Sequence, residues 1–499
     1  VIIIALSLVW LILSVDGVAA RDWFVRPAGG NYGNEDGSSY QDAWDGLQNV
    51  VWGPDGVNAG DTLYICGVHV YEMNDPYRYF ATQADINLVS GNSEEERIVI
   101  RGDWPANQGI VWGVYKNNYS TWTDEGDGVW STMIFGNSPG DWYFQDIGVP
   151  TDDSYVLLDP VSSLEELRAH PGGAHYSSDY RGGSTIYVKL TDGGNPKDRF
   201  YFAEYGYEFQ MGKKEYITFL NLKFYVPKFY WGDYWGDDGI GYIIWDNCKL
   251  WYNIRLLFGD NTHHVEVRNC DIAWGVGGLG ISENPIGNNK SLNYYIFSEN
   301  KIHDIGVRPS TQNSDAHGIG ANGGSNGIIE KNEFYNCGSG ITFYTYSAQT
   351  SVNNIIRWNW FHDMHSLGGA NDKGVEFNLS VTAVDVSGNK IYGNIVGPGV
   401  DGTGYLTKYA DEVQFYNNVA YECNVSFWLY NHAAPVRVEF KNNISLNPTQ
   451  YHIYFGGNEP EGTYHIDSDY NIFYPVSGNQ FHFRDESGYH DINLTQWQS

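Results

Sequence analysis

Several short runs in the second half of the chain carry side chains suited to carbohydrate chemistry. Aromatic faces stack on sugar rings, and carboxylates and amides form hydrogen bonds with hydroxyl groups. If such residues share one surface, they form a groove that can hold a polysaccharide. The residues expected to contact the sugar are Tyr344, Asn378, Trp428, Tyr430 and Tyr454.

A carboxylate, Glu376, stands among these residues. Glycoside hydrolysis needs an acid and a second carboxylate across the scissile bond, at a separation that distinguishes inverting from retaining outcomes. Glu376 is the first candidate for one of them. Asp315, Asp372 and Asp401 are candidates for the other, because each lies in a turn before an outward-facing strand. The competing interpretation of Glu376 is a solvated carboxylate on an acidic protein.

Cleavage by elimination is the alternative reaction. A lyase needs a base that removes the proton next to a uronate carboxylate and a cation that neutralises this carboxylate. Lys373 and Lys408, together with Tyr344, have the required chemistry. Calcium is the alternative neutraliser, since clustered carboxylates such as Asp315, Asp372 and Glu376 bind it well. The net charge of −31 repels polyuronates and favours hydrolysis of a neutral or weakly charged glycan.

Histidines near these runs have two interpretations. His317 follows Asp315 in the phrase 314–320, where it is either a catalytic residue or a histidine stacked on neighbouring coils. The pairs His303-Asp304 and His362-Asp363 follow the same repeated phrase in the same register. Repetition in register favours structural stacking for these two pairs.

A noncatalytic glycan-binding or adhesin-like surface protein is the third alternative, since fold does not fix function. A rigid stalk would carry evenly polar outward columns. Here the aromatic residues and the Glu-Lys pairing concentrate between Tyr344 and Tyr454, which favours a cleft.

A repeated phrase of Asn, one variable residue and an apolar residue indicates which structural elements position these residues. It returns every 25 to 32 residues without helical periodicity, which indicates a solenoid with one coil per repeat. Stacked Asn side chains can bond to one another as a ladder. The phrase begins at Asn300, Asn332, Asn359, Asn389, Asn417 and Asn442, and Cys248 and Cys270 align with the same corner.

Strand-like runs between these phrases alternate apolar and polar residues or carry Gly at the bends. If Ile341, Val375, Phe427 and Ile453 point inward, then Thr342, Glu376, Trp428 and Tyr454 form one outward column. Two residues further on, Tyr344, Asn378 and Tyr430 form another. Lys408 joins it if Tyr405 is inward.

This pattern resembles the right-handed parallel β-helix proteins of the pectin-lyase-like superfamily over about residues 22–483. The resemblance implies an all-β solenoid of a secreted, carbohydrate-active type. The phrase 314–320 resembles the Asp and His-Gly phrases of β-helix polygalacturonases, although their paired Asp-Asp and Arg-x-Lys are missing.

The repeat divides the chain into parts. An N-terminal cap and the first coils are expected over 21–102, a β-rich insertion over 103–198 and the main β-helix over 199–485. Residues 486–499 are expected to begin a C-terminal segment that is truncated.

Composition and the N-terminus suggest the compartment. The apolar run 1–13 and the small residues 18–20 predict a signal peptide over 1–20 and a secreted protein, extracellular or periplasmic. The acidic charge argues against binding to nucleic acid or to anionic membranes. The five cysteines lack C-x-x-C spacing and are expected in the core rather than in a zinc site. We expect a monomer with a polysaccharide substrate.

Overall fold

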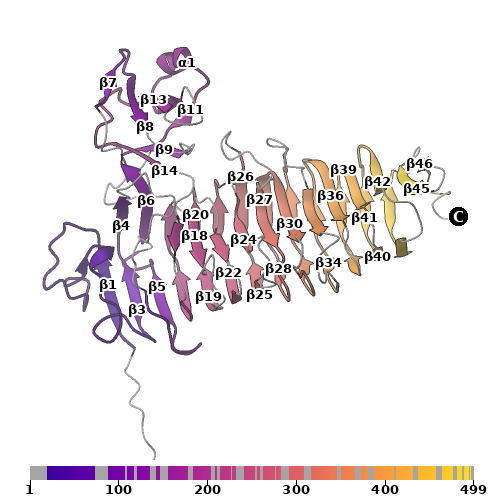
Figure 1. Ribbon diagram of the computed structural model, residues 1–499, viewed down its shortest axis with the longest axis horizontal. Helices are drawn as coiled ribbons and strands as arrows, with labels where there is room; N and C mark the ends of the chain where they lie inside the picture. The colour runs from indigo at the N-terminus through magenta and orange to yellow at the C-terminus, as the bar shows by residue number, and fades with distance from the viewer. Residues whose placement is uncertain are drawn as a thin grey trace, which may run out of the picture.

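The chain forms a long parallel β-helix with a small module beside its N-terminal coils (Figure 1). A computed structural model describes residues 20–72, 88–106, 109–116, 121–134, 142–146, 156–177, 184–203, 208–210, 214–225, 228–231, 241–252, 256–258, 262–275, 277–281, 292–307, 316–345, 350–365, 373–379, 387–408, 412–430, 436–456, 464–475, 480–485, 488–493 and 495. The expected signal peptide lies outside these residues, apart from Ala20. Within the described part, no helix is both long and apolar enough to cross a membrane.

Three long sheets run along the solenoid, and from β16 onward the successive coils contribute strands to all three. Sheet I has 14 strands. In spatial order they are β2 (Trp44–Asp45), β1 (Asp22–Arg26), β3 (Thr62–Ile65), β5 (Ile98–Arg101), β16 (Ile217–Leu220), β19 (Gly241–Asp246), β22 (His263–Arg268), β25 (Asn293–Ser298), β28 (Ile328–Glu330), β31 (Ile355–Arg357), β34 (Lys390–Tyr392), β37 (Val413–Tyr416), β40 (Val436–Lys441) and β43 (Tyr464–Asp469). A short 3-10 helix, η1 (Leu47–Asn49), follows β2 at the N-terminal cap.

Sheet II has 15 strands, and its N-terminal end reaches toward the module. The strands are β10 (Val156–Leu157), β9 (Trp142–Gln145), β14 (Phe200–Ala203), β6 (Ile110–Lys116), β17 (Lys223–Tyr225), β20 (Lys249–Trp251), β23 (Asp271–Ala273), β26 (Lys301–Ile305), β29 (Glu333–Cys337), β32 (Trp360–His362), β35 (Ile395–Val396), β38 (Val419–Tyr421), β41 (Ile444–Leu446) and β44 (Ile472–Tyr474), with β4 (Val68–Glu72) paired to β6.

Sheet III has 12 strands and carries the candidate site. They are β15 (Glu208–Gln210), β18 (Lys228–Trp231), β21 (Leu256–Phe258), β24 (Leu279–Ile281), β27 (His317–Asn322), β30 (Ser339–Thr345), β33 (Lys373–Leu379), β36 (Val400–Lys408), β39 (Cys423–Tyr430), β42 (Tyr451–Gly456), β45 (Phe481–Asp485) and β46 (Gly488–Ile492). Strand β46 pairs antiparallel to β45. Part of the expected C-terminal segment 486–499 therefore extends the third sheet.

In the residues that the structure describes, the module has a five-stranded sheet of its own and one helix. Its strands are β11 (Asp159–Pro160), β12 (Ala174–Ser177), β13 (Ser184–Lys189), β8 (Trp130–Ile134) and β7 (Thr123–Asp124), and its helix is α1 (Leu164–Ala169). The sequence places the insertion at 103–198, but β6 within that range pairs parallel with β4 and β17 as part of a coil. The module therefore begins after Lys116.

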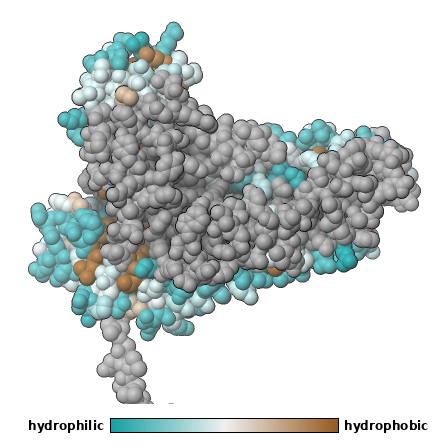
Figure 2. Space-filling view, viewed as in Figure 1, coloured by the Kyte–Doolittle hydropathy of each residue, from teal (hydrophilic) through white to brown (hydrophobic). Residues whose placement is uncertain are grey.

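The core is a continuous stack of inward side chains along the solenoid. Phe343 and Phe377 stack with ring centroids 4.8 Å apart, and Tyr405 and Phe427 stack at 5.0 Å. Parallel strands in register place identical positions of successive coils above one another, so the apolar members of each run bury one another. Among the residues coloured by hydropathy in Figure 2, hydrophilic ones predominate on the face shown.

An asparagine ladder fixes the corner that precedes sheet II. Asn300 Nδ2 donates to Asn332 Oδ1 at 2.9 Å and to Val267 O at 2.8 Å, and Cys270 N donates to Asn300 Oδ1. This ladder was expected from the repeat and is confirmed for the first three Asn residues. Its members are Asn300, Asn332, Asn359, Asn394, Asn418, Asn443 and Asn471.

The last three Asn residues assigned to this ladder from the sequence were wrong. Asn417 and Asn442 lie at positive φ, 53° and 56°, just before the true ladder residues. Asn389 belongs to a different corner, before sheet I, where Asn354 Nδ2 donates to its Oδ1. For Asn417 and Asn442 the error has a physical cause: a left-handed turn residue directly precedes the ladder position, and Asn suits both places.

Candidate active site

The outer face of sheet III brings the predicted residues into columns. Glu376 pairs with Thr342 on one side and with Leu406 on the other, and Leu406 pairs with Trp428. Tyr454 and His482 continue this column. The predicted column is confirmed, and its inward neighbours Ile341, Val375, Tyr405, Phe427 and Ile453 are buried.

A second outward column lies two residues further along the same strands. Tyr344 pairs with Asn378, which pairs with Lys408, which pairs with Tyr430. Because Tyr405 is fully buried, the phase that places Lys408 outward beside Asn378 is the correct one. Of Asn378 the structure describes only the backbone position.

A column of glycines makes the bend that shapes this face. A Cβ on Gly374 would lie 2.6 Å from Cγ2 of the buried Val396 and 2.7 Å from the backbone oxygen of Gly404 in the next coil. Such distances leave no room for a side chain. Position 374 therefore faces inward together with Val375, so Lys373 and Glu376 both face outward. The glycines in this column are Gly278, Gly318, Gly340, Gly374 and Gly404.

The bend produces a buried ion pair. Lys373 Nζ donates to Glu376 Oε2 at 2.7 Å, and the two side chains are only 6% and 1% exposed. Lys408 Nζ lies 3.8 Å from the other oxygen, Oε1. Within the described part of the chain, Oε1 accepts no hydrogen bond. Glu376 is thus a buried carboxylate between two ammonium groups, whose positive charges are opposite to its own.

His317 lies at the start of β27 on the same face. Its Nδ1 is 3.2 Å from Thr342 Oγ1 and its Nε2 is 3.3 Å from the hydroxyl of Tyr344. The side chain is buried, and contacts at both ring nitrogens fix its orientation. His317 shares an outward column with Ser339, Lys373 and Thr403, so it lies two coils from Lys373. The sequence did not identify Thr342, Ser339 or Thr403 as site residues; their outward register was the available signal.

Aromatic rings continue the face beyond Lys408. The Trp428 ring meets those of Tyr454 and Tyr430 nearly at right angles, with centroids 5.1 and 6.1 Å apart. Tyr454 stacks on His482 at 4.3 Å. Lys408 Nζ lies 5.8 Å from the centroid of Tyr430. The predicted sugar-contacting residues with described side chains, Tyr344, Trp428, Tyr430 and Tyr454, therefore share one wall with Glu376.

Of the three Asp candidates, only Asp401 lies within the described residues, and its side chain contacts His365. Asp315 and Asp372 lie outside these residues. Asp401 is the second residue of β36. Its side chain is 67% exposed, and its Oδ2 lies 3.4 Å from His365 Nδ1. No group of three or more His, Cys, Asp or Glu residues in the described chain is placed to hold a metal ion.

The stacking expected for the repeated histidines on sheet II is confirmed. His303 stacks on Tyr335 at 4.6 Å, and Tyr335 stacks on His362 at 5.4 Å. His303 bonds to Asp271 and Asp304 at 2.9 and 2.6 Å. Burial opposes protonation of His303, but these two carboxylates outweigh it and raise its pKa to about 9.

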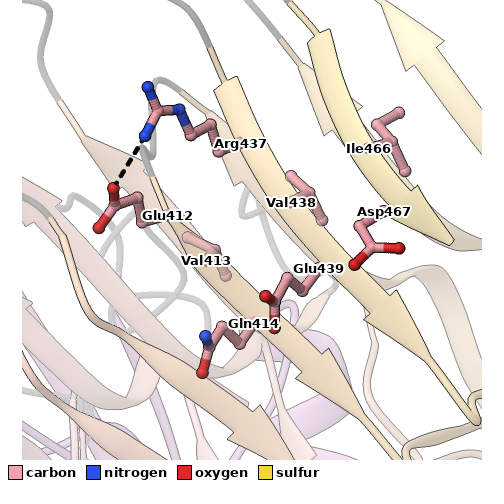
Figure 3. Close-up of a pocket in the computed structure, with 8 residues that line it drawn as sticks. All are labelled: Glu412, Val413, Gln414, Arg437, Val438, Glu439, Ile466 and Asp467. Atoms are coloured by element: carbon pink, nitrogen blue, oxygen red, sulfur yellow. Dashed lines mark hydrogen bonds and ion pairs between the residues drawn. The ribbon is translucent and has the colours of Figure 1, made fainter.

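A separate hollow of about 620 Å³ lies over the outer side of sheet I (Figure 3). Its charged lining residues are paired: Arg437 bonds to Glu412 at 3.2 Å, Tyr416 donates to Glu439, and Lys441 donates to Asp467. We place the candidate active site on sheet III instead, because the buried carboxylate and the aromatic wall are there. The lining residues in Figure 3 are Glu412, Val413, Gln414, Arg437, Val438, Glu439, Ile466 and Asp467.

Comparisons with known proteins agree with this architecture. The family model for the right handed beta helix region matches residues 237–402 and 310–469. The chain is a right-handed parallel β-helix protein. No curated protein matches it in sequence.

Solved structures of other proteins resemble it only distantly. The GH136 lacto-N-biosidase from Eubacterium ramulus is 12% identical with a TM-score of 0.49, and the match covers 91% of this chain and 68% of that one. The exopolygalacturonase from Thermotoga maritima is 7% identical with a TM-score of 0.36 and 87% coverage of both chains. The alginate lyase from Paenibacillus is 12% identical with a TM-score of 0.33, covering 54% of this chain and 91% of that one.

Proposed function

We propose that this protein cleaves an extracellular polysaccharide by glycoside hydrolysis on the outer face of sheet III. The observation that carries the proposal is Glu376, a buried carboxylate in an ion pair with Lys373 at the centre of an aromatic wall. A carboxylate kept in that position must be stabilised against its desolvation, and such arrangements concentrate at functional sites.

The ion pairs restrict the role of Glu376. Lys373 Nζ donates to one oxygen of Glu376 and Lys408 Nζ lies 3.8 Å from the other, so the role proposed for Glu376 is that of nucleophile or general base, with the proton supplied by another group. The donor is then a second carboxyl group, for which Asp315 and Asp372 remain the proposed residues. The lysines orient Glu376 and hold its charge.

Action outside the cell follows from the predicted signal peptide. The net charge of −31 supports a protein that does not bind nucleic acid or anionic membranes. A secreted monomer with a polysaccharide substrate is the corresponding proposal.

Elimination from a uronate-containing glycan is the second candidate, and the contact between His317 and Tyr344 favours it. A tyrosine hydroxyl beside a histidine can exchange a proton with a sugar ring, and two lysines around one carboxylate leave a net positive charge for a uronate. Calcium remains the alternative neutraliser.

The test is an assay of the purified protein on neutral and uronic polysaccharides. Hydrolysis releases reducing ends without the ultraviolet absorbance of an unsaturated uronate, whereas elimination produces that absorbance. Glu376→Gln is expected to reduce hydrolysis about 100- to 10,000-fold. Glu412→Gln, at an exposed carboxylate on sheet I, is the matched control and should keep wild-type activity.

Folding controls are needed because Glu376→Gln leaves the buried Lys373 without its charged partner. Losing one partner of a buried pair costs about 3–5 kcal/mol. The double variant Lys373→Met/Glu376→Gln removes both charges and should melt closer to the wild type. Full activity in a folded Glu376→Gln chain would refute the proposed role.

A further inference from the structure

Two buried polar atoms on the outer wall of sheet III have no hydrogen-bond partner within the described chain. One is Glu376 Oε1, an acceptor, and the other is Trp428 Nε1, a donor. Leaving such a group unpaired away from water costs about 1–3 kcal/mol. Two complementary groups on one wall that form no hydrogen bond within the described chain indicate a place for a ligand that bonds to both.

Register places these two groups close together. Glu376 pairs with Leu406, and Leu406 pairs with Trp428, so the two lie in one column separated by a single coil. Two strand spacings correspond to about 9.5 Å between their backbones. Leu406 between them is buried and gives the intervening floor an apolar side chain.

The surroundings of Trp428 suit a sugar ring. The rings of Tyr430 and Tyr454 stand nearly perpendicular to the indole, at 78° and 70°. Walls at right angles offer one face for the apolar C–H side of a sugar and edges for its hydroxyl groups. The indole N–H donates only, so its partner must be an acceptor such as a hydroxyl oxygen.

We infer that Glu376 and Trp428 form a subsite for a neutral sugar residue, with Trp428 Nε1 donating to one hydroxyl and Glu376 Oε1 accepting from another. The inference rests on the proposed function and deepens it by naming the class of sugar. A hydroxyl both donates and accepts, so a neutral sugar satisfies both atoms. A uronate carboxylate only accepts hydrogen bonds. It can accept one from the indole N–H, but its negative charge is repelled by that of Glu376.

Lys408 is the cation that a uronate would meet here. Its Nζ lies 3.8 Å from Glu376 Oε1, and its charge is already opposed by that carboxylate. Lys373 is bonded to the other oxygen at 2.7 Å. The inferred preference for hydroxyl groups therefore rests on Glu376 Oε1, an acceptor that cannot pair with another acceptor, and not on the charge of the lysines.

The experiment measures binding and does not depend on cleavage. Wild-type and Glu376→Gln chains are titrated by calorimetry with neutral hexasaccharides (cellohexaose, xylohexaose, mannohexaose and laminarihexaose) and with hexagalacturonate and hexamannuronate. At least one neutral hexasaccharide should bind more tightly than either uronate. Trp428→Phe keeps a ring but removes the N–H, and should weaken that binding about 10-fold.

Trp358→Phe is the matched control, since Trp358 is 49% exposed at a different corner and should change affinity less than about 2-fold. Tighter binding of a uronate, no binding of any neutral hexasaccharide, or unchanged affinity in Trp428→Phe would overturn the subsite. The proposed function can fail independently of the subsite. If the protein binds neutral sugars but cleaves none, the subsite is supported and the proposed function is refuted. If it hydrolyses uronate-containing glycans, the proposed function is supported and the subsite is refuted.

Discussion

The ion pair between Lys373 and Glu376 shows how a parallel coil makes a site from residues three positions apart. In a regular strand, positions 373 and 376 face opposite sides. Gly374 and Val375 both face inward, which interrupts the alternation of inward and outward positions. The side chains of Lys373 and Glu376 therefore both lie on the outer face, with Lys373 Nζ 2.7 Å from Glu376 Oε2. The site thus depends on a glycine that never contacts substrate.

His303 links the stability of the protein to pH at the scale of a single residue. Its pKa is about 9 in the folded protein, against 6.5 as the reference value. A raised pKa means that the stabilisation is fully present below about pH 6.5 and is lost as the pH rises through about 9. After allowance for screening, we expect an effect on the order of 2 kcal/mol.

The measurement is denaturant unfolding of the wild type and of His303→Phe between pH 6 and 10. The Phe ring keeps the stacking on Tyr335 but cannot be protonated. The wild type should lose stability over this interval more steeply than the variant. Parallel pH profiles would show that Asp271 and Asp304 do not stabilise a protonated His303.

At the scale of the elements, the Asn ladder holds one coil on the next. Asn418 Nδ2 donates to Ile391 O at 2.8 Å and to Asn443 Oδ1 at 3.1 Å. Its own Oδ1 accepts from Asn394. Removing this amide leaves several buried groups without partners, each at a cost of about 1–3 kcal/mol.

Asn418→Ala should therefore lower the free energy of unfolding by at least about 3 kcal/mol. Asn417→Gly, one position earlier, should be nearly neutral because Asn417 is exposed at φ 53° and Gly adopts this conformation without strain. Denaturant midpoints are the appropriate measure, since solenoids need not unfold in one step. Equal losses in both variants would contradict the assignment of the ladder.

At the scale of the whole molecule, the net charge of −31 opposes the compact state through self-repulsion. Exposed ion pairs such as Arg437–Glu412 offset little of it, because each contributes at most about 1 kcal/mol. Raising sodium chloride from low to physiological strength should therefore raise the calorimetric melting temperature, because salt shortens the range of repulsion to about 8 Å. A falling melting temperature would mean that ion pairs dominate.

The sequence by itself determined the solenoid and most of the outward columns. A repeat near 30 residues fixes which residues stack, because each coil must bury its apolar positions against those of the next. The alignment of Glu376 with Thr342, Trp428 and Tyr454 followed from that constraint alone, and it matches the observed register.

Only the tertiary structure decided those details that change when the alternation of inward and outward side chains shifts by one residue. It chose Asn418 over Asn417 for the ladder, placed Lys373 beside Glu376, and buried Glu376 although it faces outward. A single extra turn or an inward glycine shifts every following side chain to the other face. Local residue types do not record such a shift, since Asn suits both a turn and a ladder and Gly suits both a bend and a close approach.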